Sequence, residues 1–210
     1  MASSSLEQSW SSLWMKRFSR QEPRLRFDLG GDAWDGDDHP IPRFLQAFRR
    51  AIAIADALFQ NGCHAVVASV DDAANPAAPH HVPSAAAFAT LRASGFRAAY
   101  TSEWQSVLYP DGSDEAYQWT LRGCRLDDDE AARDCLIWHS IAAEMPISPS
   151  APIVAFLLDP SAGTMLHIYD DRGMDVMAHD AAALRVLHAT HADWLLGHDR
   201  ERISATFDMD

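Results

Sequence analysis

A short polar segment near the C-terminal end of the chain, Tyr-Asp-Asp-Arg-Gly at residues 169–173, sets two carboxylates beside a guanidinium between apolar runs. Adjacent carboxylates can shift each other's pKa, as an acid–base pair requires. The segment is therefore the first candidate for an active site. Asp175 follows it closely, and Arg26 and Asp28 carry the same functional groups in an earlier segment.

A tight hairpin turn needs the same residue types. Aspartate accepts hydrogen bonds from backbone amides two residues ahead, and glycine adopts the positive φ angles that such turns require. Arg172 or Arg26 can then pair with a carboxylate as a brace. We favour this structural interpretation over catalysis, because no other motif completes a mechanism. The candidate functional cluster consists of Tyr169, Asp170, Asp171, Arg172, Asp175, Arg26 and Asp28.

Metal and nucleophile chemistry have weaker signals. Cys135 and His139 are four residues apart on one helical face, but structural zinc sites usually have a second close pair of ligands. The acidic loop 32–39 lacks the alternating ligand spacing and closing glutamate of a calcium loop. No Gly-x-Ser-x-Gly elbow, phosphate-binding glycine loop or His-Glu-x-x-His motif occurs. We expect neither a metal nor a cofactor.

Charge is distributed unevenly along the chain. Of the 210 residues, the first 60 are neutral, whereas residues 61–210 hold nine basic and 22 acidic side chains, the source of the net charge of −13. Such a surface repels phosphate backbones, which argues against nucleic acid as a ligand. It favours a basic protein partner, although solubility alone explains it equally well. Sixteen of the 17 basic residues are arginine, which is typical of genome composition rather than of one site.

Several features predict a cytoplasmic protein. The N-terminal residues lack the charged and apolar regions of a secretory signal, and no run of apolar residues is long enough for a membrane helix. Three cysteines without regular spacing argue against a disulfide framework. We therefore expect no membrane association.

The first 22 residues predict an amphipathic helix, separate from a single globular domain at residues 23–210. Leu6, Trp10, Leu13, Trp14 and Phe18 recur at helical spacing. The two tryptophans must be covered by the core or by a partner protein, and core packing is the favoured interpretation.

The next elements predict a crossover unit. Residues 24–29 alternate as a strand, residues 42–59 carry one apolar helical stripe that stops at Gly62, and residues 64–70 are apolar enough for a strand buried on both faces. This order of strand, helix and strand predicts parallel pairing.

The second half predicts hairpins and helices. Residues 97–104 and 117–124 form a plausible antiparallel pair, residues 127–143 a helix with an acidic first turn, and residues 152–158 and 164–169 two further strands. A helix carrying residues 184–195 follows, and Asp199 caps a last turn. The expected fold is α/β, with α+β as the alternative: one domain, a mixed sheet with packed helices, and a C-terminal β-hairpin followed by helices.

These residues resemble a known family. The run from Tyr169 to Val176, the segment 26–30, the helix at 43–59 and the segment 193–201 are similar to the bacterial domain-of-unknown-function family 3885, in order from about Leu25 to Phe207. The resemblance implies a shared fold and brings no reaction, cofactor or catalytic residue.

Three functions compete at this stage. The first is a protein-binding module, such as an immunity-type antitoxin that neutralises a basic toxin through its acidic surface. The second is an enzyme acting on a small molecule or nucleotide through Asp170, Asp171 and Arg172. The third is a scaffold that presents Trp10 and Trp14 to a partner.

Overall fold

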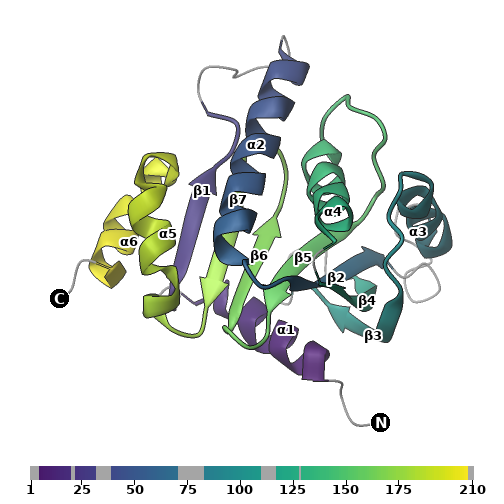
Figure 1. The fold of residues 1–210 in the computed structure, drawn as a ribbon, viewed down its shortest axis with the longest axis horizontal. Helices are drawn as coiled ribbons and strands as arrows, with labels where there is room; N and C mark the ends of the chain where they lie inside the picture. The colour runs from purple at the N-terminus through teal and green to yellow at the C-terminus, as the bar shows by residue number, and fades with distance from the viewer. Residues whose placement is uncertain are drawn as a thin grey trace.

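The computed structural model describes residues 5–19, 22–31, 39–70, 83–109, 117–127 and 129–207. Within them one seven-stranded sheet crosses the molecule, with helices on both faces (Figure 1). The strands lie in the order β1-β7-β6-β5-β2-β4-β3. They are β1 (Arg24–Asp28), β2 (Cys63–Val70), β3 (Tyr100–Val107), β4 (Gln118–Asp127), β5 (Val154–Asp159), β6 (Thr164–Ile168) and β7 (Gly173–Ala178).

Every pairing between these strands is antiparallel, so the predicted parallel pairing within a mixed sheet does not occur. The crossover unit itself is present: β1 and β2 run in the same direction, because four antiparallel steps separate them. Strands β7, β6 and β5, which come later in the chain, fill the space between them. The single α/β domain is confirmed, and the strand partners are corrected.

Helices pack on both faces of the sheet and at one end. Figure 1 shows α2 and α4 on one face, α1 beneath the other, and α5 and α6 beside β1. The helices are α1 (Ser5–Lys16), α2 (Pro40–Leu58), α3 (Ser84–Ala93), α4 (Glu130–Ala142), α5 (Arg185–Thr190) and α6 (Arg200–Phe207), with the 3₁₀ turns η2 (Ala181–Leu184), η3 (Ala192–Trp194) and η4 (Gly197–Asp199).

Strand β2 is buried on both faces, as its apolar sequence predicts. Alternate side chains point to opposite faces of a strand, so Ala65 and Val67 join the core under α2 and α4, whereas Val66 and Ala68 join the core under α1. Gly62 begins the approach to β2 with φ +82°, and a Cβ there would lie 2.6 Å from the Asp127 carbonyl oxygen. Gly62, predicted as the end of the helix, therefore also allows the backbone of Asp127 to approach closely.

The tryptophans of α1 are core residues. Trp10 and Trp14 are 2% and 1% exposed, and both rings meet Phe156 of β5 edge-on. The Trp14 indole Nε1 donates a hydrogen bond to the Leu108 carbonyl oxygen at 2.7 Å. The favoured interpretation of core packing is confirmed, and the partner-facing scaffold is wrong because neither ring reaches the surface.

Three of the predicted hairpin elements are confirmed. Strands β3 and β4 pair antiparallel, β5 returns as β6, and β6 returns as β7 across residues 169–172. The single helix predicted across residues 184–195 is wrong, because α5 ends at Thr190 and Leu195 bridges to Phe27. Leu196 N donates to the Arg26 carbonyl oxygen at 2.8 Å, so this segment lies along β1 as an extended chain. The connection between the predicted pair of strands at residues 97–104 and 117–124 includes residues 110–116, which lie outside the described residues.

None of the described helices combines the length and apolar character needed to cross a membrane.

Candidate functional site

The polar groups of the turn between β6 and β7 form hydrogen bonds within the turn itself. Asp170 Oδ1 accepts a hydrogen bond from Arg172 N at 2.7 Å, and Asp170 Oδ2 accepts one from Arg172 Nε at 2.7 Å. Tyr169 N donates to the Gly173 carbonyl oxygen at 3.3 Å, and Leu29 N donates to the Arg172 carbonyl oxygen at 3.0 Å. The Asp170 carboxylate is 2% exposed, so it is committed to closing the turn.

Gly173 is required for a different reason from the one that its sequence context predicts. Its φ is not positive, which corrects the expected left-handed turn position. A Cβ at this residue would instead collide with Tyr169 Oη and lie 2.7 Å from the Phe27 carbonyl oxygen. Glycine is thus needed because β1 and the Tyr169 ring approach the start of β7 closely.

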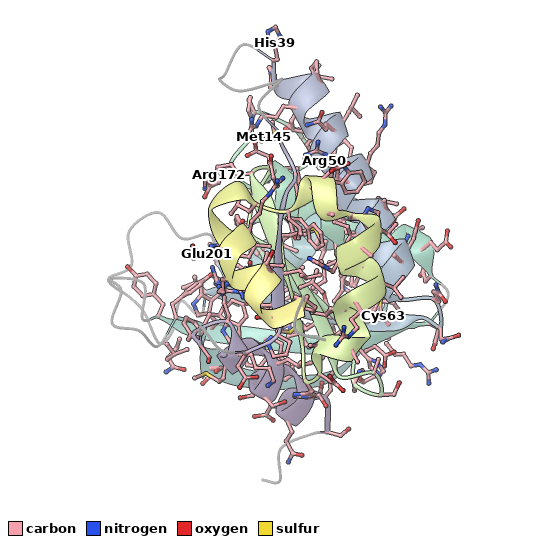
Figure 2. The ribbon with its side chains drawn as sticks, turned by 90° about the vertical axis from the view of Figure 1, so that its left-hand side faces the viewer. His39, Arg50, Cys63, Met145, Arg172 and Glu201 are labelled. Carbon is pink, nitrogen blue, oxygen red and sulfur yellow. The ribbon has the colours of Figure 1, made fainter. Side chains whose placement is uncertain are left out.

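Asp171 and Arg172 contact different parts of the molecule. Asp171 forms an ion pair with Arg43 of α2, and both side chains are largely buried, which anchors the turn to that helix. Arg172 is 65% exposed and reaches Glu144 at 3.2 Å. Figure 2 shows Arg172 near Met145, at the opposite end of the molecule from α1.

Asp28 belongs to another loop. Its Oδ1 accepts a hydrogen bond from Gly31 N at 2.8 Å, and its Oδ2 lies 3.9 Å from Arg50 Nη1 of α2. The predicted cluster therefore divides. Asp170, Asp171 and Arg172 secure a turn, whereas Arg26, Asp175 and Tyr169 meet on the α1 face of the sheet.

Asp175 is the centre of this second group. It lies opposite Arg26 in the β1–β7 register, is fully buried, and accepts a hydrogen bond from Arg26 Nε at 3.0 Å. The Arg26 guanidinium lies 6.0 Å from the centroid of the Tyr169 ring. Burial, with a contribution from the charge of Asp175, raises the pKa of Tyr169. The phenol is therefore a neutral hydrogen-bonding group.

Other arginines complete the group, and the sequence did not single them out. Arg17, just beyond α1, places its Nε 3.4 Å from Asp175 Oδ2. Asp199 lies 3.4 Å from both Arg26 and Arg202. Two backbone contacts hold the set together: Arg24 Nη1 donates to the Arg17 carbonyl oxygen at 2.6 Å, and Arg202 Nη2 donates to the Arg24 carbonyl oxygen at 3.1 Å. The arginine cluster comprises Arg17, Arg24, Arg26 and Arg202 with Asp175 and Asp199.

The charges in the cluster act on one another. Burial tends to raise the pKa of Asp199, but the hydrogen bond and charge of Arg202 outweigh it and hold that pKa below its ordinary value. Burial lowers the pKa of Arg24, and the nearby Arg202 and Arg26 lower it further, against the opposing effect of Asp175. The Asp199 carboxylate is therefore ionised at pH 7, and Arg24 is crowded by like charge.

His167 borders the cluster on the interior side. It lies opposite Asp175 in the β6–β7 register, is 1% exposed, and stacks on Phe156 with 4.9 Å between ring centroids. Burial first, and the charge of Arg17 second, lower its pKa well below the ordinary value. This imidazole is neutral at pH 7, and its Nδ1 has no hydrogen-bond partner.

The cysteines and His139 occupy structural environments. Burial raises the pKa of both Cys63 and Cys124 to about 12, so these thiols stay protonated. His139 Nδ1 accepts a hydrogen bond from Ala151 N at 2.9 Å. Across the described residues, no three or more His, Cys, Asp or Glu side chains are placed to share a metal ion. Residues 32–38 of the acidic loop lie outside the described part of the chain.

A second candidate site is an open hollow on the opposite face of the sheet, between α2 and α4. Its volume is about 370 Å³, and it is lined by Phe48, Ala131, Trp138 and Pro149 together with Asp134. Carboxylates flank it along the start of α4 and the end of α2. This acidic surface consists of Asp56, Asp129, Glu130 and Asp134, with the base Arg133 between Asp56 and Asp134.

Comparison with known proteins gives a single match. The family model described as a domain of unknown function (DUF3885) matches residues 3–199. The chain belongs to the DUF3885 family. Because the match begins at residue 3, the DUF3885 region includes α1 as well as the sheet. No curated protein and no solved structure matches the chain.

Proposed function

We propose that this DUF3885 protein is a protein-binding module of the immunity type, which neutralises a basic toxin by covering its functional site. The observation that carries the proposal is the apolar hollow between α2 and α4 with the acidic surface beside it. A hollow of this kind supplies the two ingredients of a protein interface, an apolar centre and a charged border.

The apolar part provides affinity. Phe48 and Trp138 are partly buried, and their ring centroids lie 6.0 Å apart on the wall of the hollow. The Trp138 indole Nε1 is already bonded to the Pro149 carbonyl oxygen at 2.8 Å, which fixes the ring in place. Rigid aromatic walls suit an inserted apolar side chain, because little entropy is lost when they are covered.

The charged part provides orientation and speed. Four carboxylates and one guanidinium give the acidic surface a formal charge of −3, and the Asp56 and Asp134 side chains are 55% and 36% exposed. Complementary charge steers a basic partner toward the hollow and speeds association at low salt. This agrees with the net charge of −13 of the chain.

The test is capture of a partner from the native cells, followed by binding measurements with the purified pair. Ala131→Arg, at the exposed edge of the hollow, should weaken binding by about 100-fold or more, since a charged side chain would fill an apolar contact. Ala89→Arg is the matched control, because Ala89 is an exposed helical alanine on α3. The captured partner should also arrest growth when expressed alone, and this protein should relieve the arrest.

A harmless partner, or one bound equally well by Ala131→Arg, would refute the proposal. The alternative of an enzyme using Asp170, Asp171 and Arg172 draws no support from their contacts. Asp170 closes the turn and Asp171 pairs with Arg43, which leaves neither carboxylate poised toward a substrate.

A further inference from the structure

The arginine cluster carries more positive charge than its contacts balance. Within the described residues, the four guanidiniums pair with no carboxylate besides Asp175 and Asp199, so the cluster has a formal excess of two positive charges. This excess occurs in a chain whose net charge is −13. Buried or half-buried like charges are costly unless an anion offsets them.

The hydrogen-bonding capacity of these arginines is also unused. Each carboxylate is shared between two guanidiniums, at 3.0 and 3.4 Å for Asp175 and at 3.4 Å for both contacts of Asp199. None of these pairs among the described residues forms the two parallel hydrogen bonds of a full arginine–carboxylate fork. Three buried nitrogens have no hydrogen-bond partner: Arg17 Nη1, Arg24 Nε and Arg202 Nε. These nitrogens therefore keep hydrogen-bonding capacity that a bound anion would use.

The guanidiniums of the cluster are partly exposed, whereas the carboxylate beneath them is buried. The side chains of Arg17, Arg26 and Arg202 are 23%, 25% and 19% exposed, whereas Asp175 beneath them is 1% exposed. Asp175 therefore acts as a buried anchor beneath the partly exposed side chains of Arg17 and Arg26. Figure 1 shows the elements that bring these groups together, α1 beneath the sheet and α6 beside β1.

We infer that the arginine cluster is a binding site for a dianionic oxyanion, the phosphoryl group of a small molecule. A phosphate monoester carries about −1.5 to −2 charges at neutral pH, which matches the excess, and its oxygens accept several guanidinium bonds at once. The chloride ion, with one charge and no directed acceptors, fits less well. The site lies on the α1 face of the sheet and is independent of the proposed toxin-binding hollow.

The experiment is calorimetric titration of the full chain with inorganic phosphate at pH 7.5 and constant ionic strength. Saturable binding of one phosphate per chain is expected, and sulfate but not chloride should compete. Arg202→Gln and Arg17→Gln should each raise the Kd about tenfold, as expected for loss of a charge-assisted hydrogen bond. Arg200→Gln is the matched control: Arg200 is exposed on the same helix as Arg202, and its loss should change the Kd less than about twofold.

Asp199→Asn separates binding from folding. It removes a competing carboxylate and leaves the four guanidiniums, so it should bind phosphate more tightly than the natural protein even where it lowers the melting temperature. Absence of saturable binding up to about 10 mM phosphate would overturn the inference. Equal affinity of Arg17→Gln, Arg202→Gln and Arg200→Gln would also overturn it. Because no protein partner enters this titration, its result is separate from that of the toxin test.

Discussion

The turn at residues 169–173 and the arginine cluster both contain aspartates and arginines, but these groups are hydrogen-bonded differently in the two regions. In the turn, Asp170 accepts hydrogen bonds from the backbone amide and the guanidinium of Arg172, and Asp171 forms an ion pair with Arg43. In the cluster, Asp175 and Asp199 are each divided between two arginines, and three guanidinium nitrogens lack partners. A saturated set holds a fold together, whereas an unsaturated one has capacity left for a ligand.

The largest expected effect comes from the anchor of the cluster. Asp175→Asn leaves Arg17 and Arg26 beside Arg24 without the buried carboxylate, and should lower the free energy of unfolding by about 3 kcal/mol. Asp171→Asn in the turn, which loses one ion pair, should cost about 1–2 kcal/mol. Urea unfolding of both variants measures the difference. Equal losses would remove the distinction between the two regions.

Gly173→Ala tests the close packing at the turn. The added methyl group collides with Tyr169 Oη and the Phe27 carbonyl oxygen, so a loss of about 2 kcal/mol is expected. Gly197→Ala is the control, because a Cβ there meets nothing within 4 Å, and it should change stability by less than about 0.5 kcal/mol. Thermal unfolding of the two variants is sufficient. A stable Gly173→Ala protein would mean that the strand contact tolerates a side chain.

The buried histidine beside the cluster, His167, should make the stability of the protein depend on pH. The folded-state pKa of His167 is depressed, so the unfolded chain takes up a proton below pH 6.5 while the folded chain does not. The contribution to stability is complete above that pH and is lost as the pH falls. Between pH 7.5 and 5.5 the natural protein should lose about 1 kcal/mol more than His167→Gln. Urea unfolding of the two proteins at both pH values measures the difference, and equal losses would contradict the role given to His167.

The smallest effect is expected at the exposed end of the turn. Arg172 is 65% exposed and its partner Glu144 is 63% exposed, so solvent screens their attraction. Because Arg172 keeps its bonds to the buried Asp170 carboxylate when Glu144 is neutralised, Glu144→Gln should change the free energy of unfolding by less than about 1 kcal/mol. A loss comparable to that of Asp175→Asn would place Glu144 in a larger network than its contact with Arg172 indicates.

Local sequence patterns predicted the elements well and their partners poorly. The apolar stripe of α2 and the alternation of β1 depend on neighbours in the chain, and both are confirmed. The pairing of β1 with β7 joins residues about 150 positions apart, as in the contact of Arg26 with Asp175, and no periodicity reports it. For this reason parallel pairing was predicted where the chain inserts three later strands.

Only part of the arginine cluster could be predicted, because its members also come from segments that are distant in the sequence. Arg26, Asp175 and Tyr169 were singled out because they belong to the polar segment near residues 169–175 or carry the same functional groups, and they do meet. Arg17, Arg24 and Arg202 were missed, since sixteen of 17 basic residues are arginine and no single one stands out. A usable signal was present in Arg24 and Arg26, which alternate in β1 and so share a face. Only the tertiary fold adds the ends of α1 and α6.

The extended segment at Leu195 and Leu196 has a consequence for self-association. β1 is the last strand of the sheet on its side, and an uncovered edge strand offers free amides and carbonyls to other chains. The bridge from Phe27 to Leu195 and the bond from Leu196 N to the Arg26 carbonyl oxygen occupy that edge. A chain ending before residue 195 would therefore expose a ready template for intermolecular strands, and aggregation rather than simple unfolding is its expected fate.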